Sequence, residues 1–367
     1  MKEKYIIAHV FFFAFGYSMV SFELPPFLTL LGANQLYLGE MGFLLMLPNI
    51  FLPIFFLNLR DQSIVYRLII LSVLITDFSV LSIYFVRSLQ LMLLLIFTIG
   101  VGQFIWWITT EIFFSNLSRD SRLINIYSSV WGMAYFLSPI TSSYSIAIFG
   151  YLNNLILSFT LILISLFLLL LFRERVQGAV ENIPHNGGRV YLESFFPSFA
   201  AGLVFSVFYS IFPGFLFKSG YNIILLGYVM TAASLFRLIG FFLVINLTDT
   251  RMMERIMNVS MFLMAVIFLP FFTINIYAII AMSALIGLAS SAGISIPLIY
   301  ISRKGDSHIS RNISIYELSF GTSVSLFSLL FGAVSEYMGP RVPYILNSVI
   351  IISIIFIYMF LKKRMFK

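Results

Sequence analysis

Three ionisable side chains lie inside long hydrophobic segments of this sequence: Glu23, Asp77 and Arg237. A charge in apolar surroundings is costly unless it faces water or a partner, so such residues usually belong to a functional site or to an internal bond. A guanidinium group stays charged, and its planar fork suits carboxylate or phosphate groups. These residue types predict ion recognition and proton exchange.

Arg237 supports two interpretations. It either binds an acidic group of a ligand or forms an internal salt bridge with Glu23 or Glu317. The two are compatible if the ligand competes with the carboxylate for the guanidinium group. We expect Arg237 to be the principal ligand-binding residue.

Glu23 is the candidate for binding and releasing a proton. It lies just before the Pro25-Pro26 pair, separated from it by one residue, and the loss of backbone hydrogen bonds at these prolines is expected to break the helix and leave an irregular, hydrated wall. A carboxylate buried at such a place can exchange a proton near neutral pH. We therefore expect Glu23 to be the proton-coupling residue.

Catalytic chemistry is not indicated by the remaining reactive residues. The chain has no cysteine, and its three histidines, His9, His185 and His308, are expected at widely separated loops or helix ends. No nucleophile, base or metal set can be assembled from them. The sequence predicts a protein that is not an enzyme and that holds no metal and no cofactor.

The elements that position these residues are transmembrane helices. Hydrophobic residues make up 60% of the chain and charged residues 10%, which requires lipid as the solvent. Apolar runs of roughly 20 to 26 residues can each cross about 30 Å of hydrocarbon. We expect twelve helices in all, with centres near residues 18, 48, 76, 101, 137, 162, 204, 234, 264, 287, 324 and 351.

Basic residues in the loops predict the orientation, because they are retained on the cytoplasmic side. With the amino terminus inside, the opposite side has only Arg87, Lys218 and Arg341. Both termini are then cytoplasmic, in a multi-pass protein of the cell membrane. The net charge of +7 is explained by this topology, so no nucleic-acid partner is implied.

The second half of the chain repeats the first. A loop signature recurs 188 positions later, and further loop positions recur at an offset of 188 or 189, in the same direction. The matched pairs include Pro25 and Pro213, Gly32 and Gly220, Asn34 and Asn222, Gly39 and Gly227, Asp61 and Asp249, Arg67 and Arg255, Gly132 and Gly321, and Gly150 and Gly339.

The repeat predicts two six-helix bundles, residues 1–172 and 192–367. The longest polar stretch, residues 173–191, is expected to be a flexible cytoplasmic linker between them. Asn49 is the repeat counterpart of Arg237, so this charge is present in one half alone. That asymmetry suggests that function placed it, and we include Asn49 among the candidate ligand-binding residues.

Two parallel six-helix repeats, a central linker and a charged loop after the second helix of each half resemble the major facilitator superfamily of transporters. In that family the loop reads approximately G-x-L-x-D-R-x-G-R-R, and this chain keeps the leucine, the aspartate and a terminal arginine as Leu59, Asp61 and Arg67. The resemblance implies an all-α membrane fold of twelve helices in two pseudo-symmetric bundles.

The resemblance also implies a cytoplasmic gate. It places Asp61 against the start of the eleventh helix and Asp249 against the start of the fifth, where a carboxylate is favoured by the helix dipole. The alternative is that each aspartate only fixes its own turn. Glu111 and Glu317 are expected near the same solvated layer, bonded to loop arginines such as Arg67 or Arg255, with a proton-carrying role as the alternative.

In this family the first, fourth, seventh and tenth helices line a central cavity. These helices have polar or aromatic residues at helical spacing, and we select Tyr17, Gln103, Trp107 and Tyr209 as candidate ligand-binding residues. Serine and glycine on the tenth helix are instead expected to allow close packing. The resemblance places the third helix outside the bundle, so Asp77 is expected to be protonated or bonded to a neighbour.

These expectations add up to a secondary active transporter. We expect a monomer that moves a small anionic or zwitterionic organic solute by alternating access, coupled to H+. The first alternative is an exporter of hydrophobic compounds or drugs, because the cavity walls are aromatic. The second is a solute sensor on the same fold that does not transport.

Overall fold

The computed structural model describes residues 3–57, 59, 61–117, 121–172, 192–244, 247, 249–266, 275–303 and 309–365, and these residues form helices and short connections. The predicted linker, residues 173–191, lies outside them. The helices of the first half are α1 (Glu3–Leu30), α2 (Gln35–Met46), α3 (Pro48–Phe51), α4 (Pro53–Phe56), α5 (Gln62–Phe85), α6 (Leu89–Leu117), α7 (Ser121–Phe149) and α8 (Tyr151–Leu171).

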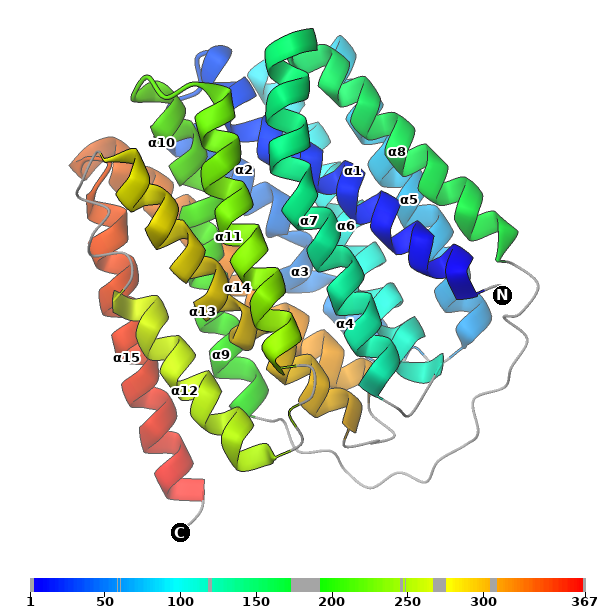
Figure 1. Ribbon diagram of the computed structural model, residues 1–367, viewed down its shortest axis with the longest axis vertical. Coiled ribbons are helices and arrows are strands. Elements are labelled where there is room, and N and C mark those ends of the chain that lie inside the picture. The colour runs from blue at the N-terminus through cyan, green and yellow to red at the C-terminus, as the bar shows by residue number, and fades with distance from the viewer. Residues whose placement is uncertain are drawn as a thin grey trace.

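The helices of the second half lie beside those of the first (Figure 1). The elements of the second half are α9 (Leu192–Phe205), the π-helix η2 (Ser206–Ile211), α10 (Phe212–Lys218), α11 (Ile223–Val244), α12 (Thr250–Val266), α13 (Ile276–Arg303), α14 (Ile309–Met338) and α15 (Val342–Met365).

Ten described segments are long and apolar enough to cross a membrane, and the chain is a multi-pass membrane protein. Within a bilayer the backbone has no water to bond, so continuous apolar runs fold into helices that satisfy their own N–H and C=O groups. The serine-rich α7 and the 17-residue α12 are not among the ten. The count of twelve spans therefore stays a prediction.

The expected break at Pro25 and Pro26 is wrong, because α1 continues through both prolines to Leu30. The helix persists because neighbouring helices surround it: α1 packs closely against α7 and α8. Within this helix the hydroxyl of Thr29 also donates a hydrogen bond to the Pro25 carbonyl, at 2.8 Å. Proline is tolerated in membrane helices for this reason.

Prolines do interrupt two other segments. The second apolar run is divided into α2, α3 and α4, and Pro48 and Pro53 begin the last two. The seventh run contains η2, directly before α10 with Pro213 in its first turn. A proline has no N–H for the preceding turn, so the hydrogen-bond pattern before it can widen from α to π.

The internal repeat is visible in the backbone. Four glycines among the described residues have a positive φ: Gly32 at 93°, Gly220 at 91°, Gly150 at 84° and Gly339 at 106°. They form two of the matched pairs, and each lies in the loop that follows a helix, where a side chain would strain the left-handed backbone. The glycine pairs were thus matched in sequence because both halves make the same turns.

Helix starts repeat in the same way. The side chain of Asn34 accepts a hydrogen bond from the Tyr37 N–H at 2.9 Å, and that of Asn222 accepts one from the Leu225 N–H at 2.8 Å. Both are N-cap interactions, which satisfy a donor that the first turn of a helix leaves free. The matched asparagines therefore begin α2 and α11.

The two halves meet along two helix pairs, α2 with α14 and α7 with α11. At the end of the bundle opposite the termini, which we call the distal end, the backbones approach closely. A Cβ atom added to Gly39 would lie 2.8 Å from the Cα of Gly332, and one added to Gly227 would lie 2.5 Å from the Cβ of Ser143. Gly332 and Ser143 are 189 positions apart, so these contacts are related by the repeat.

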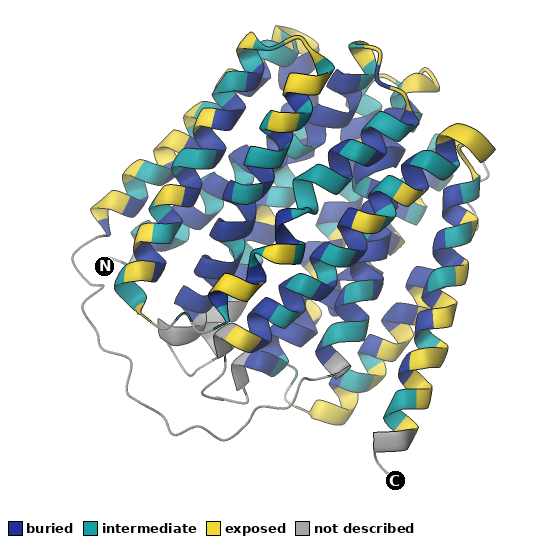
Figure 2. Ribbon diagram, turned by 180° about the vertical axis from the view of Figure 1, so that it is seen from behind, coloured by how far each residue is buried: buried dark blue, intermediate teal, exposed yellow. Residues whose placement is uncertain are grey.

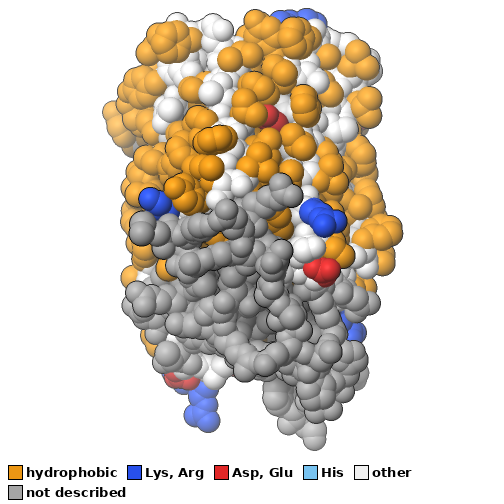
Figure 3. All heavy atoms as spheres, turned by 90° about the vertical axis from the view of Figure 1, so that its right-hand side faces the viewer, with side chains coloured by type: hydrophobic (Ala, Val, Ile, Leu, Met, Phe, Trp, Pro, Cys, Tyr) orange, Lys and Arg blue, Asp and Glu red, His pale blue; other side chains and the backbone are white. Residues whose placement is uncertain are grey.

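Burial agrees with a membrane environment. The helices turn buried faces toward the middle of the bundle and exposed faces outward (Figure 2). Large hydrophobic side chains are exposed on the outside, among them Phe55 at 77% and Phe78 at 63%. On the face shown in Figure 3 hydrophobic side chains cover most of the described surface, and charged side chains are few. Such a surface is stable in contact with lipid.

Candidate functional site

A central cavity lies between the two halves, with a volume of about 120 Å3. A single water needs roughly 10–15 Å3 by the same measure, so several waters or part of a small organic molecule fit. Its walls come from α1, α2, α3, α6, α7, α9, η2, α11, α13 and α14. The residues that sequence reasoning selected and that line the cavity are Tyr17, Asn49, Gln103, Trp107, Glu111, Tyr209, Arg237 and Glu317.

Arg237 is the cationic group of this cavity. Its side chain is 1% exposed, and its Nη2 donates a hydrogen bond to the hydroxyl of Tyr209 on η2. The guanidinium carbon lies 4.5 Å from the ring centroid of Phe205 and 5.2 Å from that of Tyr209, which is cation–π geometry. Nε and Nη1 have no hydrogen-bond partner among the described residues.

The internal salt bridge considered for Arg237 is not formed. No carboxylate of the described residues pairs with it, and the ion pair found among those residues is between Lys362 and Glu254. Three of the five guanidinium N–H groups, one on Nε and two on Nη1, thus have no partner among the described residues. A buried donor without a partner is costly, so the geometry favours a ligand that accepts hydrogen bonds there.

Glu317 on α14 is the second charged residue of the site. It is 6% exposed, and its Oε2 accepts a hydrogen bond from Nδ2 of Asn49 at 3.1 Å. Asn49 lies on α3, so this bond joins the two halves. Gly321 leaves the space that the Asn49 side chain occupies in this hydrogen bond, because a Cβ at position 321 would lie 2.0 Å from the Cβ of Asn49.

Glu111 on α6 is the third charged residue of the site. It is 3% exposed, and its Oε2 has no hydrogen-bond partner among the described residues. The expected position of Glu111 and Glu317 in a solvated layer is wrong, since both are buried against the cavity, and neither bonds to Arg67 or Arg255, which are exposed. The helices extend further than the sequence suggested, to Leu117 for α6 and from Ile309 for α14.

Aromatic rings form much of the cavity wall. Trp107 packs at 5.2 Å between ring centroids against Trp131 and at 6.3 Å against Tyr135, both on α7. Tyr17 faces the cavity from α1, and the buried Oε1 atom of Gln103 has no hydrogen-bond partner among the described residues. The wall is therefore largely apolar, with a few polar atoms that can orient a ligand.

Glu23 lies outside this cavity. It is fully buried, and its Oε2 accepts a hydrogen bond from Nδ2 of Asn154 on α8 at 2.7 Å. The same Nδ2 lies 2.8 Å from the hydroxyl of Ser142 on α7. The carboxylate thus joins α1, α7 and α8 within the first half, and its Oε1 is without a partner among the described residues.

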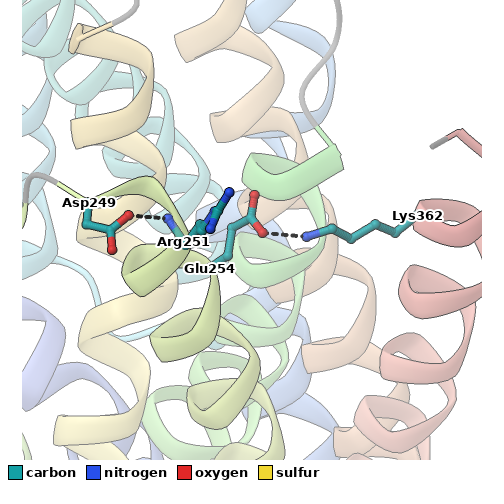
Figure 4. Close-up of polar contacts among 4 residues, drawn as sticks. All are labelled: Asp249, Arg251, Glu254 and Lys362. Carbon is teal, nitrogen blue, oxygen red and sulfur yellow. Dashed lines mark hydrogen bonds and ion pairs between the residues drawn. The ribbon is translucent and has the colours of Figure 1, made fainter.

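Asp61 and Asp249 each cap their own helix. Asp61 accepts a hydrogen bond from the Ser63 N–H at 2.8 Å, and Asp249 accepts one from the Arg251 N–H at 2.9 Å (Figure 4). Both carboxylates are exposed. This geometry matches the alternative in which each aspartate fixes its own turn. The predicted contacts with the starts of α7 and α14 fall on side chains outside the described residues.

Figure 4 also shows Glu254 on α12 with Lys362 on α15, 2.7 Å apart. Both side chains are partly exposed, so the pair contributes at most about 1 kcal/mol. It lies within the second half and away from the cavity. We assign it to the packing of these two peripheral helices.

The expected place of His9, a loop or a helix end, is wrong, because the residue is fully buried within α1. Its Nδ1 lies 3.0 Å from the carbonyl oxygen of Ser165 on α8, and Trp106 Nε1 on α6 donates to its Nε2 at 3.0 Å. Both ring nitrogens are satisfied by a neutral imidazole that donates from Nδ1. The residue therefore links three helices of the first half.

Sequence reasoning missed part of the wall because it considered four helices. Besides α11, from which the sequence had already selected Arg237, the cavity is also faced by α2, α7 and α14. The expected tenth helix, α13, contributes Ile294. The prediction that small residues of the tenth helix serve packing is confirmed at Gly287, where a Cβ would lie 1.8 Å from the Ala233 carbonyl oxygen. A signal for the missed residues was available in the helical spacing of Trp131 and Tyr135 and of Tyr316 and Phe320.

No protein-family model and no curated protein matches the sequence. A solved structure does match over almost the whole chain: a bacterial homologue of the human lysosomal transporter Spinster, in an inward-facing and unoccupied conformation. The TM-score is 0.64 at 13% sequence identity, with 97% of this chain and 95% of that chain covered. The chain shares the fold of this structure, in agreement with the all-α membrane fold that the resemblance to the major facilitator superfamily implied. In this fold the cavity described above lies between two related halves.

Proposed function

We propose that this protein is an alternating-access transporter of a small organic solute that has an acidic group. The observation that carries the proposal is Arg237, a buried guanidinium at a central cavity with two nitrogens that lack partners. A carboxylate or phosphate group is the ligand chemistry that complements such a group. Asn49, Gln103, Trp107, Tyr17 and Tyr209 would orient the rest of the solute.

Support for alternating access comes from the fold and from the contacts between the halves. The cavity lies between two halves related by an internal repeat, an arrangement in which one half can rock against the other around the bound solute. The structural neighbour is described as a transporter. We place this protein in the cell membrane as a monomer with both termini in the cytoplasm, with Asp61, Arg67, Asp249 and Arg255 as gate residues.

The experiment is solute counterflow in proteoliposomes with purified protein. Candidate acids are first selected by the increase they cause in the thermal unfolding midpoint, since a ligand of the folded state stabilises it. Arg237→Gln should abolish the uptake of these acids, and Arg237→Lys should reduce it, because an ammonium group does not present the planar fork. Unchanged counterflow in Arg237→Gln contradicts the proposal.

Coupling to protons through Glu23 is the finer part of the proposal. The motivating observation is a fully buried carboxylate held by one amide donor, with its second oxygen unmatched. Glu23→Gln should preserve counterflow, which needs no ion gradient, and abolish accumulation driven by a pH gradient. Accumulation that persists in Glu23→Gln would remove the coupling role from this residue.

Export of hydrophobic compounds is the second candidate, and the aromatic cavity wall favours it. The two candidates differ in the counterflow assay. Lipophilic compounds that exchange equally well in the wild type and in Arg237→Gln would support the exporter. A solute that binds without counterflow would instead support a sensor on the same fold.

A further inference from the structure

Two carboxylates of the central cavity have no cationic partner among the residues that the structure describes. Glu111 and Glu317 are 3% and 6% exposed, and neither forms an ion pair within the described part of the chain. The one described bond to them is the 3.1 Å hydrogen bond from Asn49 to Glu317. A buried carboxylate without a counter-charge is unstable, so a cation from solution would supply what this site lacks.

Arg237, Glu111 and Glu317 line the same cavity, from α11, α6 and α14 respectively. The opposite charges line one cavity yet do not pair with each other. A ligand with both charges can bridge them.

The wall between these charges suits an apolar body. Trp107, Tyr135, Phe205, Tyr316 and Phe320 line the same cavity. Aromatic rings bury hydrophobic area, and their faces also attract a cationic group. A ligand with a hydrophobic middle and an ammonium group would therefore be retained by both the rings and the carboxylates.

We propose that the central cavity selects a zwitterionic solute. Glu111 and Glu317 bind its ammonium group, and Arg237 binds its carboxylate or phosphate group. This inference rests on the proposed transport function and narrows its substrate class. It assigns ligand binding to two glutamates for which the sequence suggested a gate.

The test uses matched probes on one apolar body and the purified full-length chain. Each set contains a free amino acid, its N-acetyl derivative without the cation, and its methyl ester without the anion, built on phenylalanine, tryptophan and leucine. Binding is measured from the thermal unfolding midpoint during titration. The wild type should prefer at least one free amino acid over its N-acetyl derivative by roughly tenfold or more, as expected for loss of a charged hydrogen bond.

Variants separate charge from size. Glu317→Gln and Glu111→Gln keep the shape of the side chain and should each remove most of the preference for a free amine. Arg237→Gln should remove the preference for the acid over its ester. Glu254→Gln, on the peripheral helix α12 and away from the cavity, should keep both preferences. The same N-acetyl probe is used with every protein, so the effect of its added size is constant. A change in the preference for the free amine between wild type and variant therefore reports the loss of the carboxylate charge.

Two outcomes overturn the inference. One is that N-acetyl derivatives bind as tightly as the free amino acids, in the wild type and in Glu317→Gln alike; the other is that no probe with an amine stabilises the protein. If simple acids still bind through Arg237 and exchange in counterflow, the proposed function stands and the zwitterion is wrong. If no acid binds or exchanges, the proposed function fails as well.

Discussion

At the scale of single residues, the polar groups that hold the first half together differ from those that face the cavity. His9 is fully buried in α1 with both ring nitrogens bonded to neighbouring helices, whereas Arg237 and Glu111 have atoms at the cavity without a partner among the described residues. A satisfied buried group stabilises the fold, and an unmatched one at a cavity is available to a ligand.

His9 provides a stability prediction at this scale. In His9→Leu the indole N–H of Trp106 loses its acceptor, which should lower the free energy of unfolding by about 1–3 kcal/mol. The measurement is the thermal unfolding midpoint in detergent. Binding of the acids selected for Arg237 should not change, because His9 is outside the cavity.

A double-mutant cycle with Trp106→Phe is the control. Removing both partners leaves no unmatched donor, so the effects of His9→Leu and Trp106→Phe should be less than additive, with a coupling energy of about 1 kcal/mol or more. Strictly additive effects would show that the hydrogen bond makes no net contribution.

At the scale of elements, η2 places Tyr209 against Arg237. The π-helix Ser206–Ile211 directly precedes α10, in which Pro213 lacks the N–H that an α-helical turn would use. A π turn holds one more residue than an α turn and so changes which side chains face inward. The repeat counterpart, Pro25, lies in α1 without such a turn.

Replacement of Pro213 tests this placement. Pro213→Ala restores an N–H that can bond to the Tyr209 carbonyl, so η2 should tighten toward α-helix and turn the Tyr209 side chain away from Arg237. We expect affinity for the selected acids to fall by roughly tenfold, as for loss of a charged hydrogen bond. Pro25→Ala is the matched control and should leave affinity unchanged; equal affinity in all three proteins would contradict a role for η2.

At the scale of the whole molecule, close backbone contact seals the distal end. Gly39 and Gly332 meet there, and the carboxylate of Glu336 accepts a hydrogen bond from the Gln35 N–H at the start of α2, at 3.0 Å. These contacts join α2 of one half to α14 of the other. Alternating access requires that they separate when the distal end opens.

Gly332→Leu should favour that opening. A Cβ at this position would lie 2.7 Å from the Gly39 Cα and 2.9 Å from the Gln35 carbonyl oxygen, both of them backbone atoms that cannot give way. The readout is the distance between spin labels on Leu30→Cys and Lys218→Cys, in a chain that has no native cysteine. We expect the main population to move to longer distance.

The control is Leu330→Phe, two residues away on a 45% exposed position of the same helix. It adds volume toward the surroundings and should leave the label distances as in the wild type. If Gly332→Leu also leaves them unchanged, the Gly39 and Gly332 contact does not set the balance between conformations.

The sequence alone determined the features that depend on local or averaged properties. Continuous apolar segments require helices in lipid, and the matched pairs Gly32 and Gly220, and Asn34 and Asn222, predicted equivalent turns and caps because glycine and asparagine suit few backbone positions. Burial energetics likewise selected Arg237 as a residue that needs a ligand or a partner, because a charge inside an apolar segment is costly wherever the helix packs.

Only the tertiary structure decided which groups meet. Whether Arg237 pairs with Glu317 depends on the rotation of α11 and α14, and the structure pairs Glu317 with Asn49 instead. Glu23 bonds to Asn154, and helix α1 stays continuous at Pro25 because neighbouring helices pack against it. Both features depend on packing between segments that are far apart in sequence. A helical segment fixes the spacing of its side chains, but its rotation and depth follow from the sum of its contacts with the rest of the bundle.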